Sequence, residues 1–155
     1  MPRGLRPRPG DAMHPDVTSV FTKIIRGELP ARFVWRDDKC VGFLSINPLK
    51  PGHTLVVPRE EIDHWLDLPP DLLSHLVGVA QTIGRAQQRV WKPVKVGLML
   101  AGLEVPHVHL HVVPIWGVHD LDFANAERDP DPASLDEAAR LLREALAGEP
   151  GAVDD

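Results

Sequence analysis

Residues 107–113 read HVHLHVV, with three histidines at alternate positions of an otherwise apolar run. Successive side chains of a β-strand point to opposite faces, and every second residue lies about 7 Å further along. The interleaved aliphatic side chains are expected in the core and are Val108, Leu110 and Val112. The imidazoles are expected together on one other face and are His107, His109 and His111. Because buried imidazoles cost free energy unless they are hydrogen-bonded, such a row indicates a chemical role.

Two kinds of chemistry use a row of imidazoles, and a third interpretation needs none. One histidine could attack an electrophile while its neighbours orient it or move protons. Alternatively, the row could hold a zinc ion, with a further ligand from His53, His64 or His119. The sequence spacing of these three histidines does not match a metal-binding motif, so we rank metal binding second. The plainest alternative is three satisfied or solvent-facing histidines on an edge strand.

Length and composition limit the class of protein. The chain has 155 residues, enough for one domain, and 43% of them are hydrophobic. A net charge of −5 argues against a polymeric nucleic acid or a membrane surface as partner, because both require a basic footprint. Cys40 is the only cysteine, which excludes an internal disulfide and suits a cytoplasmic protein. No apolar run of about 18 residues predicts a membrane span.

Hydrophobic periodicity and turn residues predict a small α+β domain with an antiparallel sheet. Ser19 is expected to cap a first helix that Gly27 ends, and Ser134 to cap a last helix that Gly148 ends. Helices are expected at 20–26, 71–90 and 134–147, and strands at 33–35, 40–46, 53–57, 95–101 and 107–114. The expected organisation is a disordered tail at 1–15, a domain at 16–120 and a C-terminal extension with a short helix at 121–155.

The histidine row resembles the H-φ-H-φ-H-φ-φ motif of the histidine triad (HIT) family, where φ is apolar. Two further blocks are similar to that family, FTKIIRGELPARFVWRDD at 21–38 and FLSINPLKPGHTLVVPRE at 43–60. The approach to the row, AGLEVPHVHLHVVP at 101–114, also resembles the family. The blocks occur in family order and cover most of residues 19–116. The resemblance implies a five-stranded antiparallel sheet with two main helices, usually paired into a homodimer that binds nucleotides.

The resemblance also implies roles for the histidines. His109 would attack the α-phosphorus of a nucleotide, and water would then release a nucleoside monophosphate from the nucleotidyl-histidine. His107 and His111 would orient the nucleophile, contact the phosphate or assist the leaving group, and His53 would support the row from behind. A neutral imidazole is nucleophilic, which agrees with these roles near pH 7.

The same correspondence implies a nucleotide pocket, although core packing is the default for each apolar residue taken alone. The implied apolar wall is Val20, Phe21, Ile24, Leu29, Phe43, Ile46 and Leu55. Ser45 and Asn47 would lie at the ribose. The bend before the row would meet the phosphate through backbone N–H groups at Gly102, Glu104 and Val105.

The sequence departs from the family pattern at three places. Ser19, Thr22 and Glu61 stand where some members hold a structural zinc, so we expect no metal and no cofactor. Ser45 replaces an aspartate that grips ribose in many members. Leu103 replaces a common phosphate-contacting glutamine, and Glu104 puts a carboxylate beside it.

The resulting hypothesis is a nucleoside phosphoramidase-like hydrolase or transferase that acts at a nucleoside 5′-α-phosphate through His109. Its ligand would be a purine nucleotide or nucleoside phosphoramidate, an adenylate or a dinucleoside polyphosphate. Two alternatives stay open: a nucleotide-binding regulator with little turnover, and a metal-binding protein that uses the histidine row.

Overall fold

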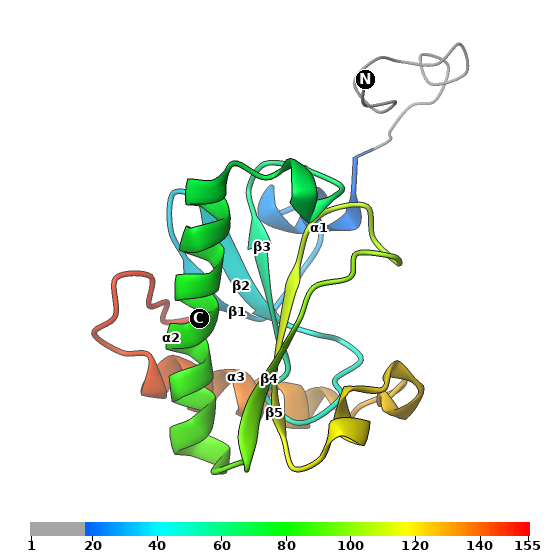
Figure 1. Cartoon of the computed structure of the whole chain (residues 1–155). Coiled ribbons are helices and arrows are strands. Elements are labelled where there is room, and N and C mark those ends of the chain that lie inside the picture. The colour runs from blue at the N-terminus through cyan, green and yellow to red at the C-terminus, as the bar shows by residue number, and fades with distance from the viewer. Residues whose placement is uncertain (1–17) are drawn as a thin grey trace.

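A computed structural model describes residues 18–155; the tail expected at 1–15 lies outside the described residues. The described chain forms one antiparallel sheet in the order β1-β2-β3-β5-β4, with the long helix α2 running across it (Figure 1). The strands are β1 (Phe33–Arg36), β2 (Cys40–Leu44), β3 (Thr54–Pro58), β4 (Lys95–Met99) and β5 (Leu110–Ile115). The helices are α1 (Val20–Ile25), α2 (Pro70–Trp91) and α3 (Pro132–Ala145). The α+β class and the five-stranded antiparallel sheet predicted from the sequence are confirmed.

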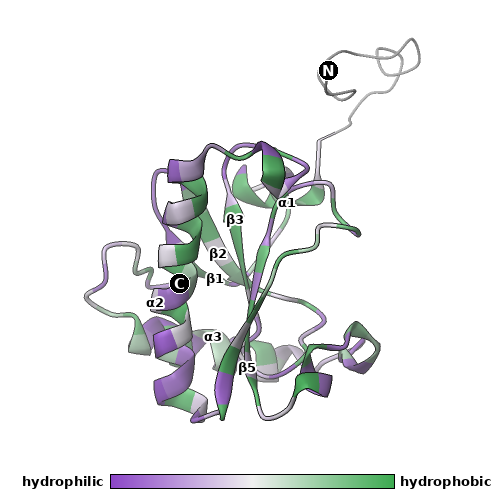
Figure 2. Cartoon of the chain, viewed as in Figure 1, coloured by the Kyte–Doolittle hydropathy of each residue, from purple (hydrophilic) through white to green (hydrophobic). Residues whose placement is uncertain are grey.

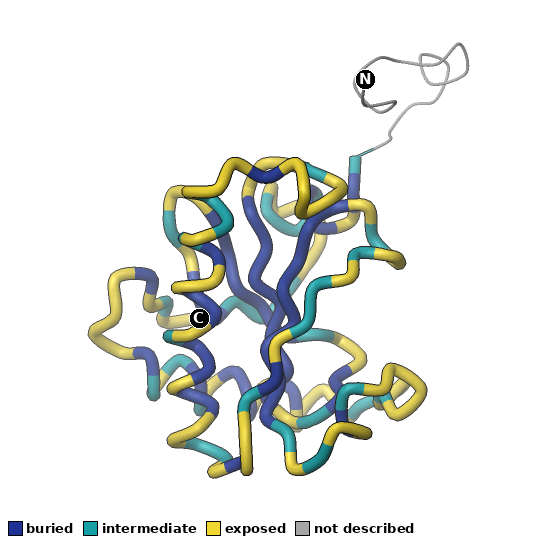
Figure 3. The backbone as a smooth tube through the Cα atoms, in the orientation of Figure 1, coloured by how far each residue is buried: buried dark blue, intermediate teal, exposed yellow. Residues whose placement is uncertain are grey.

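Both faces of the central strands are covered, because β2 and β3 are buried along their whole length. Alternate residues of these strands go to two different cores, as the period of two requires. Cys40, Leu44 and Val56 pack with α2 and α3, whereas Phe43 and Leu55 pack with Phe21 of α1. The dark central strands in Figure 3 are these buried segments. The sheet therefore separates a structural core from a face against which the short helix α1 packs.

Strand β5 begins later than the sequence predicts. The expected strand at 107–114 starts at Leu110 in the structure, so His107 and His109 precede it. Pairing with β3 begins at Leu110, and the N–H of Val108 donates to the carbonyl of Ile62 instead. The interleaved side chains Val108, Leu110 and Val112 are nevertheless buried, as their alternation predicts.

The C-terminal helix α3 starts two residues before the expected position. Asp131 is its N-cap and accepts from the N–H of Ala133, while Ser134 donates to the carbonyl of Asp131. Pro132 fits the first helical position because its missing N–H has no intrahelical partner there. The helix packs against α2 and β1, and Leu142 and Leu146 are fully buried. Residues assigned to an extension thus contribute to the main core.

Helix α2 buries one face against the sheet. Its buried residues recur at helical spacing and are Leu76, Val79, Ala80, Ile83, Gly84, Ala86 and Gln87. Hydrophilic and hydrophobic residues alternate in bands along the helix, as expected when one face is buried (Figure 2). Among the described residues, no helix is both long enough and apolar enough to cross a membrane.

Candidate functional site

A pocket of about 420 Å³ lies beside the histidine row, between α1, the strands β2 and β3, and the bend that precedes β5. Expected residues that line it are Val20, Phe21, Ile24, Phe43, Ser45, Ile46, Asn47, His53, Leu55, Glu104, Val105, His109 and His111. Residues that the sequence analysis did not assign to it are Pro30, Ala31, Leu44, Phe123, Ala126 and Arg128. The structure therefore brings together segments that are up to about one hundred residues apart in the sequence.

Three expected site residues do not line the pocket. Leu29 is 38% exposed, and its neighbours Pro30 and Ala31 form that part of the wall. Gly102 has a φ of 76°, a left-handed conformation that suits glycine, and it lies in the bend behind Glu104. His107 is fully buried behind the pocket surface.

The end of the pocket near residue 128 comes from the segment after β5, which the sequence analysis left without a role. The ring of Phe123 meets the ring of His111 edge to face, with 5.0 Å between centroids. Asn47 donates from Nδ2 to the carbonyls of Glu127 and Arg128, at 3.1 Å each. These bonds fasten the segment to the loop after β2. Phe123 is aromatic, which is the one feature of this segment that could have indicated a binding residue. Its position in the sequence follows no pattern that links it to the histidine row.

His109 presents one defined nitrogen for chemistry. Its Nδ1 lies 2.7 Å from the carbonyl oxygen of His107, and a carbonyl can only accept, so Nδ1 carries the hydrogen. The lone pair of the neutral ring is therefore on Nε2. The ring of Phe21 packs against that of His109 edge to face, with 4.9 Å between centroids, which restricts ring rotation. A backbone carbonyl thus sets the tautomer that a nucleophilic imidazole needs.

His111 has the opposite tautomer, which is determined through His53 by the N–H of Leu49. The N–H of Leu49 donates to Nδ1 of His53 at 3.0 Å, so the hydrogen of neutral His53 is on Nε2. That nitrogen lies 2.9 Å from Nδ1 of His111 and donates to it. The hydrogen of His111 is consequently on Nε2. The pocket therefore holds a lone pair on His109 and an N–H donor on His111.

The histidines of the row are neutral near pH 7. Burial, together with the neighbouring His109, lowers the pKa of His111 to about 4. Burial also lowers the pKa of His53 to about 3, with both pocket histidines contributing. The pKa values of His107 and His109 are lowered by burial as well, against the hydrogen bonds to backbone carbonyls that raise them. Neutral imidazoles are the form that the tautomer assignments above require.

Two charged side chains of opposite sign line the pocket. The carboxylate of Glu104 is close enough to raise the pKa of His109, in opposition to burial. Arg128 is at the segment fastened by Asn47. The hydroxyl oxygen of Ser45 accepts from the N–H of Asn47 at 3.2 Å. The pocket therefore joins an apolar wall to a few polar groups, as small-molecule sites commonly do.

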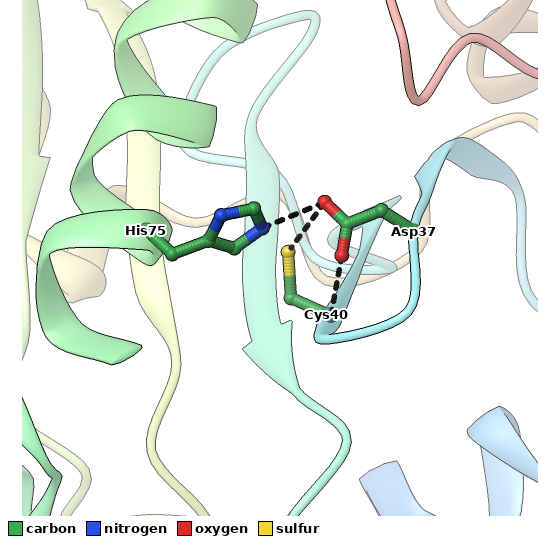
Figure 4. Close-up of side chains that lie close together, drawn as sticks. All are labelled: Asp37, Cys40 and His75. Carbon is green, nitrogen blue, oxygen red and sulfur yellow. Dashed lines mark hydrogen bonds and ion pairs between the residues drawn. The ribbon is translucent and has the colours of Figure 1, made fainter. Parts of the chain in front are cut away.

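A metal site at the histidine row is not favoured by these bonds. His107 and His53 use both ring nitrogens on protein partners, and His109 and His111 use one each. Within residues 18–155, one group of three possible ligands comes together elsewhere, at Asp37, Cys40 and His75 (Figure 4).

The Asp37 carboxylate already accepts several hydrogen bonds. Trp35 and His75 donate to Oδ2 at 2.8 Å, and the N–H groups of Lys39 and Cys40 donate to Oδ1 at 2.8 Å. Desolvation opposes the effect of these donors, and the pKa of Asp37 falls to about 2. The Cys40 thiol is buried, which raises its pKa and keeps it protonated. These hydrogen bonds stabilise the turn between β1 and β2, and the bond from His75 attaches that turn to α2.

Comparisons with known proteins agree with this geometry. A family model described as the HIT domain matches residues 26–116. An uncharacterised HIT-like protein of Mycobacterium tuberculosis is 35% identical over 144 residues, which is 88% of this chain and 98% of the relative. The crystal structure of a Zn-bound histidine triad family protein from Mycobacterium smegmatis superposes with a TM-score of 0.73 at 34% identity, covering 84% of this chain and 94% of that one. The chain belongs to the HIT family.

One relative carries a named activity. The protein named adenylylsulfatase HINT3 from Arabidopsis thaliana is 28% identical over 127 residues, which cover 75% of this chain and 64% of the plant protein. The HIT family therefore includes hydrolases.

Proposed function

We propose that this chain is a hydrolase or transferase that acts at the α-phosphate of a nucleoside 5′-phosphate derivative, with His109 as the nucleophile. The observation that carries the proposal is the hydrogen bond from His109 Nδ1 to the carbonyl of His107, at 2.7 Å. That bond leaves the lone pair of a neutral, buried ring on Nε2. His109 lines a pocket whose apolar wall suits a nucleoside.

In the first step, the Nε2 lone pair of His109 attacks the α-phosphorus. A nitrogen–phosphorus bond forms as the bond from phosphorus to the leaving group breaks. The leaving group departs with the bonding electrons and takes up a proton from the medium. The Nε2–H of His111 is the donor that stabilises charge on a phosphate oxygen. A fixed donor in a site with little water stabilises such charge without reorganising.

In the second step, water attacks the phosphorus of the nucleotidyl-His109. The nitrogen–phosphorus bond breaks, its electrons return to Nε2, and the water loses a proton to the medium. The product is a nucleoside monophosphate. Backbone N–H groups in the bend at Glu104 and Val105 are further candidates to meet the phosphate oxygens.

The substrate classes compatible with this chemistry share an adenylyl or related nucleotidyl group. We propose nucleoside phosphoramidates, aminoacyl adenylates and dinucleoside polyphosphates, with a purine nucleotide as the common part. The adenylylsulfatase among the relatives adds adenosine 5′-phosphosulfate to the set that is worth measuring. Glu104 beside the nucleophile disfavours an anionic leaving group by charge repulsion, so we rank the phosphoramidates first.

The direct test is to trap the intermediate. Wild-type protein is mixed with an adenosine phosphoramidate and quenched in alkaline denaturant, because phosphorus–imidazole bonds are lost in acid. Intact mass spectrometry should show one added adenylyl group, and peptide mapping should place it on His109. Turnover without any adduct on that residue would contradict the proposal.

A second candidate is a nucleotide-binding regulator with little turnover. The observation in its favour is the reduced polar shell, in which Ser45 is a neutral residue and Leu103 is 93% exposed rather than directed at a ligand. Binding of adenosine monophosphate with neither adduct nor turnover across the substrate panel would favour this candidate.

We further propose that the protein is a cytoplasmic homodimer. The surface that supports pairing is a groove of about 570 Å³ between α2 and the edge strand β4. Two exposed apolar side chains, Val77 and Leu98, line that groove. An edge strand with an apolar border is a surface that proteins commonly cover by assembly.

A further inference from the structure

A closed group of hydrogen bonds lies at His107, the first histidine of the row, which does not itself line the pocket. The Oγ of Ser19 lies 2.7 Å from Nδ1 of His107. One carboxylate oxygen of Glu61 accepts from the N–H of Ser19 at 2.8 Å and from the hydroxyl of Thr22 at 2.6 Å. The N–H of Thr22 donates to Oγ of Ser19 at 3.0 Å. Residues that are distant in sequence therefore meet at one buried point, which we call the Ser19–Thr22–Glu61 network.

The chemistry of the groups determines every hydrogen in this network. Glu61 is ionised, because its donors hold the pKa below the usual range against the effect of burial, so it only accepts. The Thr22 hydroxyl therefore donates to Glu61. The Nε2 of His107 lies 2.8 Å from the carbonyl of Pro58 and must carry the ring hydrogen. Nδ1 of His107 is thus an acceptor, and the Ser19 hydroxyl donates to it.

The resemblance to the HIT family matches Ser19, Thr22 and Glu61 to positions that hold a structural zinc in some members, and the chemistry of these side chains does not fit that ion. A structural zinc site takes four thiolate or imidazole ligands, whereas Ser19 and Thr22 offer neutral hydroxyls. The network contains one imidazole, His107, and its Nδ1 is used by Ser19. The oxygen of Glu61 is likewise shared by two short hydrogen bonds.

We propose that the Ser19–Thr22–Glu61 network is a metal-free positioning device that holds His107, and through it the nucleophile His109, in the place of a structural zinc ion. The connection to the nucleophile is direct, because the carbonyl of His107 accepts the Nδ1 hydrogen of His109. His107 is consequently a positioning residue, since both of its ring nitrogens are bonded to protein groups.

The network also fixes the pocket wall relative to the nucleophile. Ser19 is the N-cap of α1, and α1 carries Phe21, whose ring packs against His109. Holding Ser19 to His107 and Glu61 therefore holds the wall and the nucleophile in one arrangement. A displacement of about 1 Å in such an arrangement can cost roughly 100-fold in rate.

The first test needs no substrate. Purified wild-type protein, dialysed against chelator and then exposed to zinc, should retain no stoichiometric zinc by elemental analysis. In ¹⁵N spectra, His107 should be the neutral Nε2–H tautomer, and Ser19→Ala should shift the His107 Nδ1 resonance while Ser74→Ala, on the exposed side of α2, should not. Retention of about one zinc per chain, or an unmoved Nδ1 resonance in Ser19→Ala, would overturn the proposal.

The second test is kinetic and rests on the proposed function. With an adenosine phosphoramidate, Ser19→Ala and Thr22→Val should lower kcat roughly 10- to 100-fold and change KM by less, because the nucleophile is misplaced while the pocket remains. Ser19→Thr keeps both the cap and the hydroxyl and should restore most of the rate. An unchanged kcat in Ser19→Ala would overturn the positioning role. Absence of turnover in the wild type would instead count against the proposed function, and the zinc and ¹⁵N results would still decide on the network.

Discussion

Of the three imidazoles in the row, His109 carries its hydrogen on Nδ1, whereas His107 and His111 carry theirs on Nε2. His107 accepts from Ser19, His109 donates to a backbone carbonyl, and His111 accepts from His53. These differences arise from the partners of each ring, because isolated histidines would populate both tautomers. The three positions of the row should therefore respond differently to substitution.

At the residue scale, we expect His109→Ala to abolish turnover of an adenosine phosphoramidate while adenosine monophosphate still binds. The apolar wall and the His111 donor remain in that variant, so calorimetry should show an affinity within a few-fold of wild type. His111→Ala should slow the reaction by roughly 10²–10³-fold, as expected when a fixed hydrogen-bond donor to the reacting phosphate is lost. Near wild-type turnover in His109→Ala would exclude this residue as the nucleophile.

A second residue-scale prediction concerns the ribose. Ser45→Asp should tighten binding of adenosine monophosphate, because a carboxylate can accept from both ribose hydroxyls. Each bond to a charged acceptor contributes roughly 1.5–3 kcal/mol at best, before competition from water. Ser74→Asp adds the same charge on the exposed side of α2 and should leave affinity unchanged. Calorimetry that finds equal or weaker binding in Ser45→Asp would indicate that the ribose is held elsewhere.

At the element scale, the short helix α1 packs at the pocket, whereas the C-terminal helix α3 packs in the core. Helix α1 has six residues and is held by its cap, Ser19, and by burial of Phe21 against the row. Helix α3 packs on α2 and β1, and its buried residues belong to the same cluster as those of α2. The first positions the pocket, whereas the second completes the core that supports the sheet.

We therefore expect Leu142→Ala in α3 to lower the free energy of unfolding by about 2–5 kcal/mol, the usual cost of an emptied leucine site in a core. Leu142 is fully buried, whereas Leu66 is 67% exposed, so Leu66→Ala should change stability by less than about 0.5 kcal/mol. Urea denaturation of both variants measures the difference. Equal midpoints for the two variants would mean that α3 is dispensable to the core.

At the scale of the whole molecule, the exposed groove between α2 and β4 contrasts with the well-covered β1 edge. Residues 151–152 cover that edge, since Gly151 accepts from the N–H of Arg36 and Ala152 pairs with Trp35. The β4 edge has no such covering segment among residues 18–155. A homodimer would protect the apolar side chains of this groove.

Light scattering at micromolar concentration should accordingly give the mass of a dimer. Leu98→Arg places a charge at a half-exposed position of the groove and should give monomers, whereas Leu66→Arg, on a different surface, should not. The folded monomer should retain its secondary structure by circular dichroism. A monomeric mass for the wild type would rule out this assembly.

The buried histidines should also make stability depend on pH. The pKa values of His53 and His111, about 3 and about 4 in the folded chain, lie below the value of 6.5 that applies when the chain unfolds. The unfolded state therefore takes up protons first as pH falls. The free energy of unfolding should decline between pH about 6.5 and 4, by about 1.4 kcal/mol per pH unit for each proton taken up.

Urea denaturation at a series of pH values measures this decline. His119 is largely exposed, so His119→Gln should leave the slope unchanged. A constant free energy of unfolding from pH 7 to 5 would show that the folded and unfolded chains take up equal numbers of protons, so that folding does not lower the pKa of these rings.

The sequence alone determined the class of fold and the alternation that separates the histidines from the core side chains between them. Alternation within residues 107–113 separated the core positions Val108, Leu110 and Val112 from the histidines, because a strand-like backbone has a period of two. Turn residues and periodicity located the strands, and the cap at Ser19 was identified from its residue type. These signals are local, so they can be found without knowing which segments meet.

Only the tertiary structure decided which nitrogen of each histidine carries the hydrogen. The hydrogens of His107 and His111 depend on Pro58 and Leu49, partners at sequence separations that no pattern within the motif encodes. The same holds for Arg128, which reaches the pocket because Asn47 holds its segment. Hydrogen bonds across long sequence separations form only when the whole chain is packed. For that reason the sequence could identify the row of imidazoles, whereas only the fold shows that His109 has its lone pair on Nε2 and that His111 has an N–H donor there.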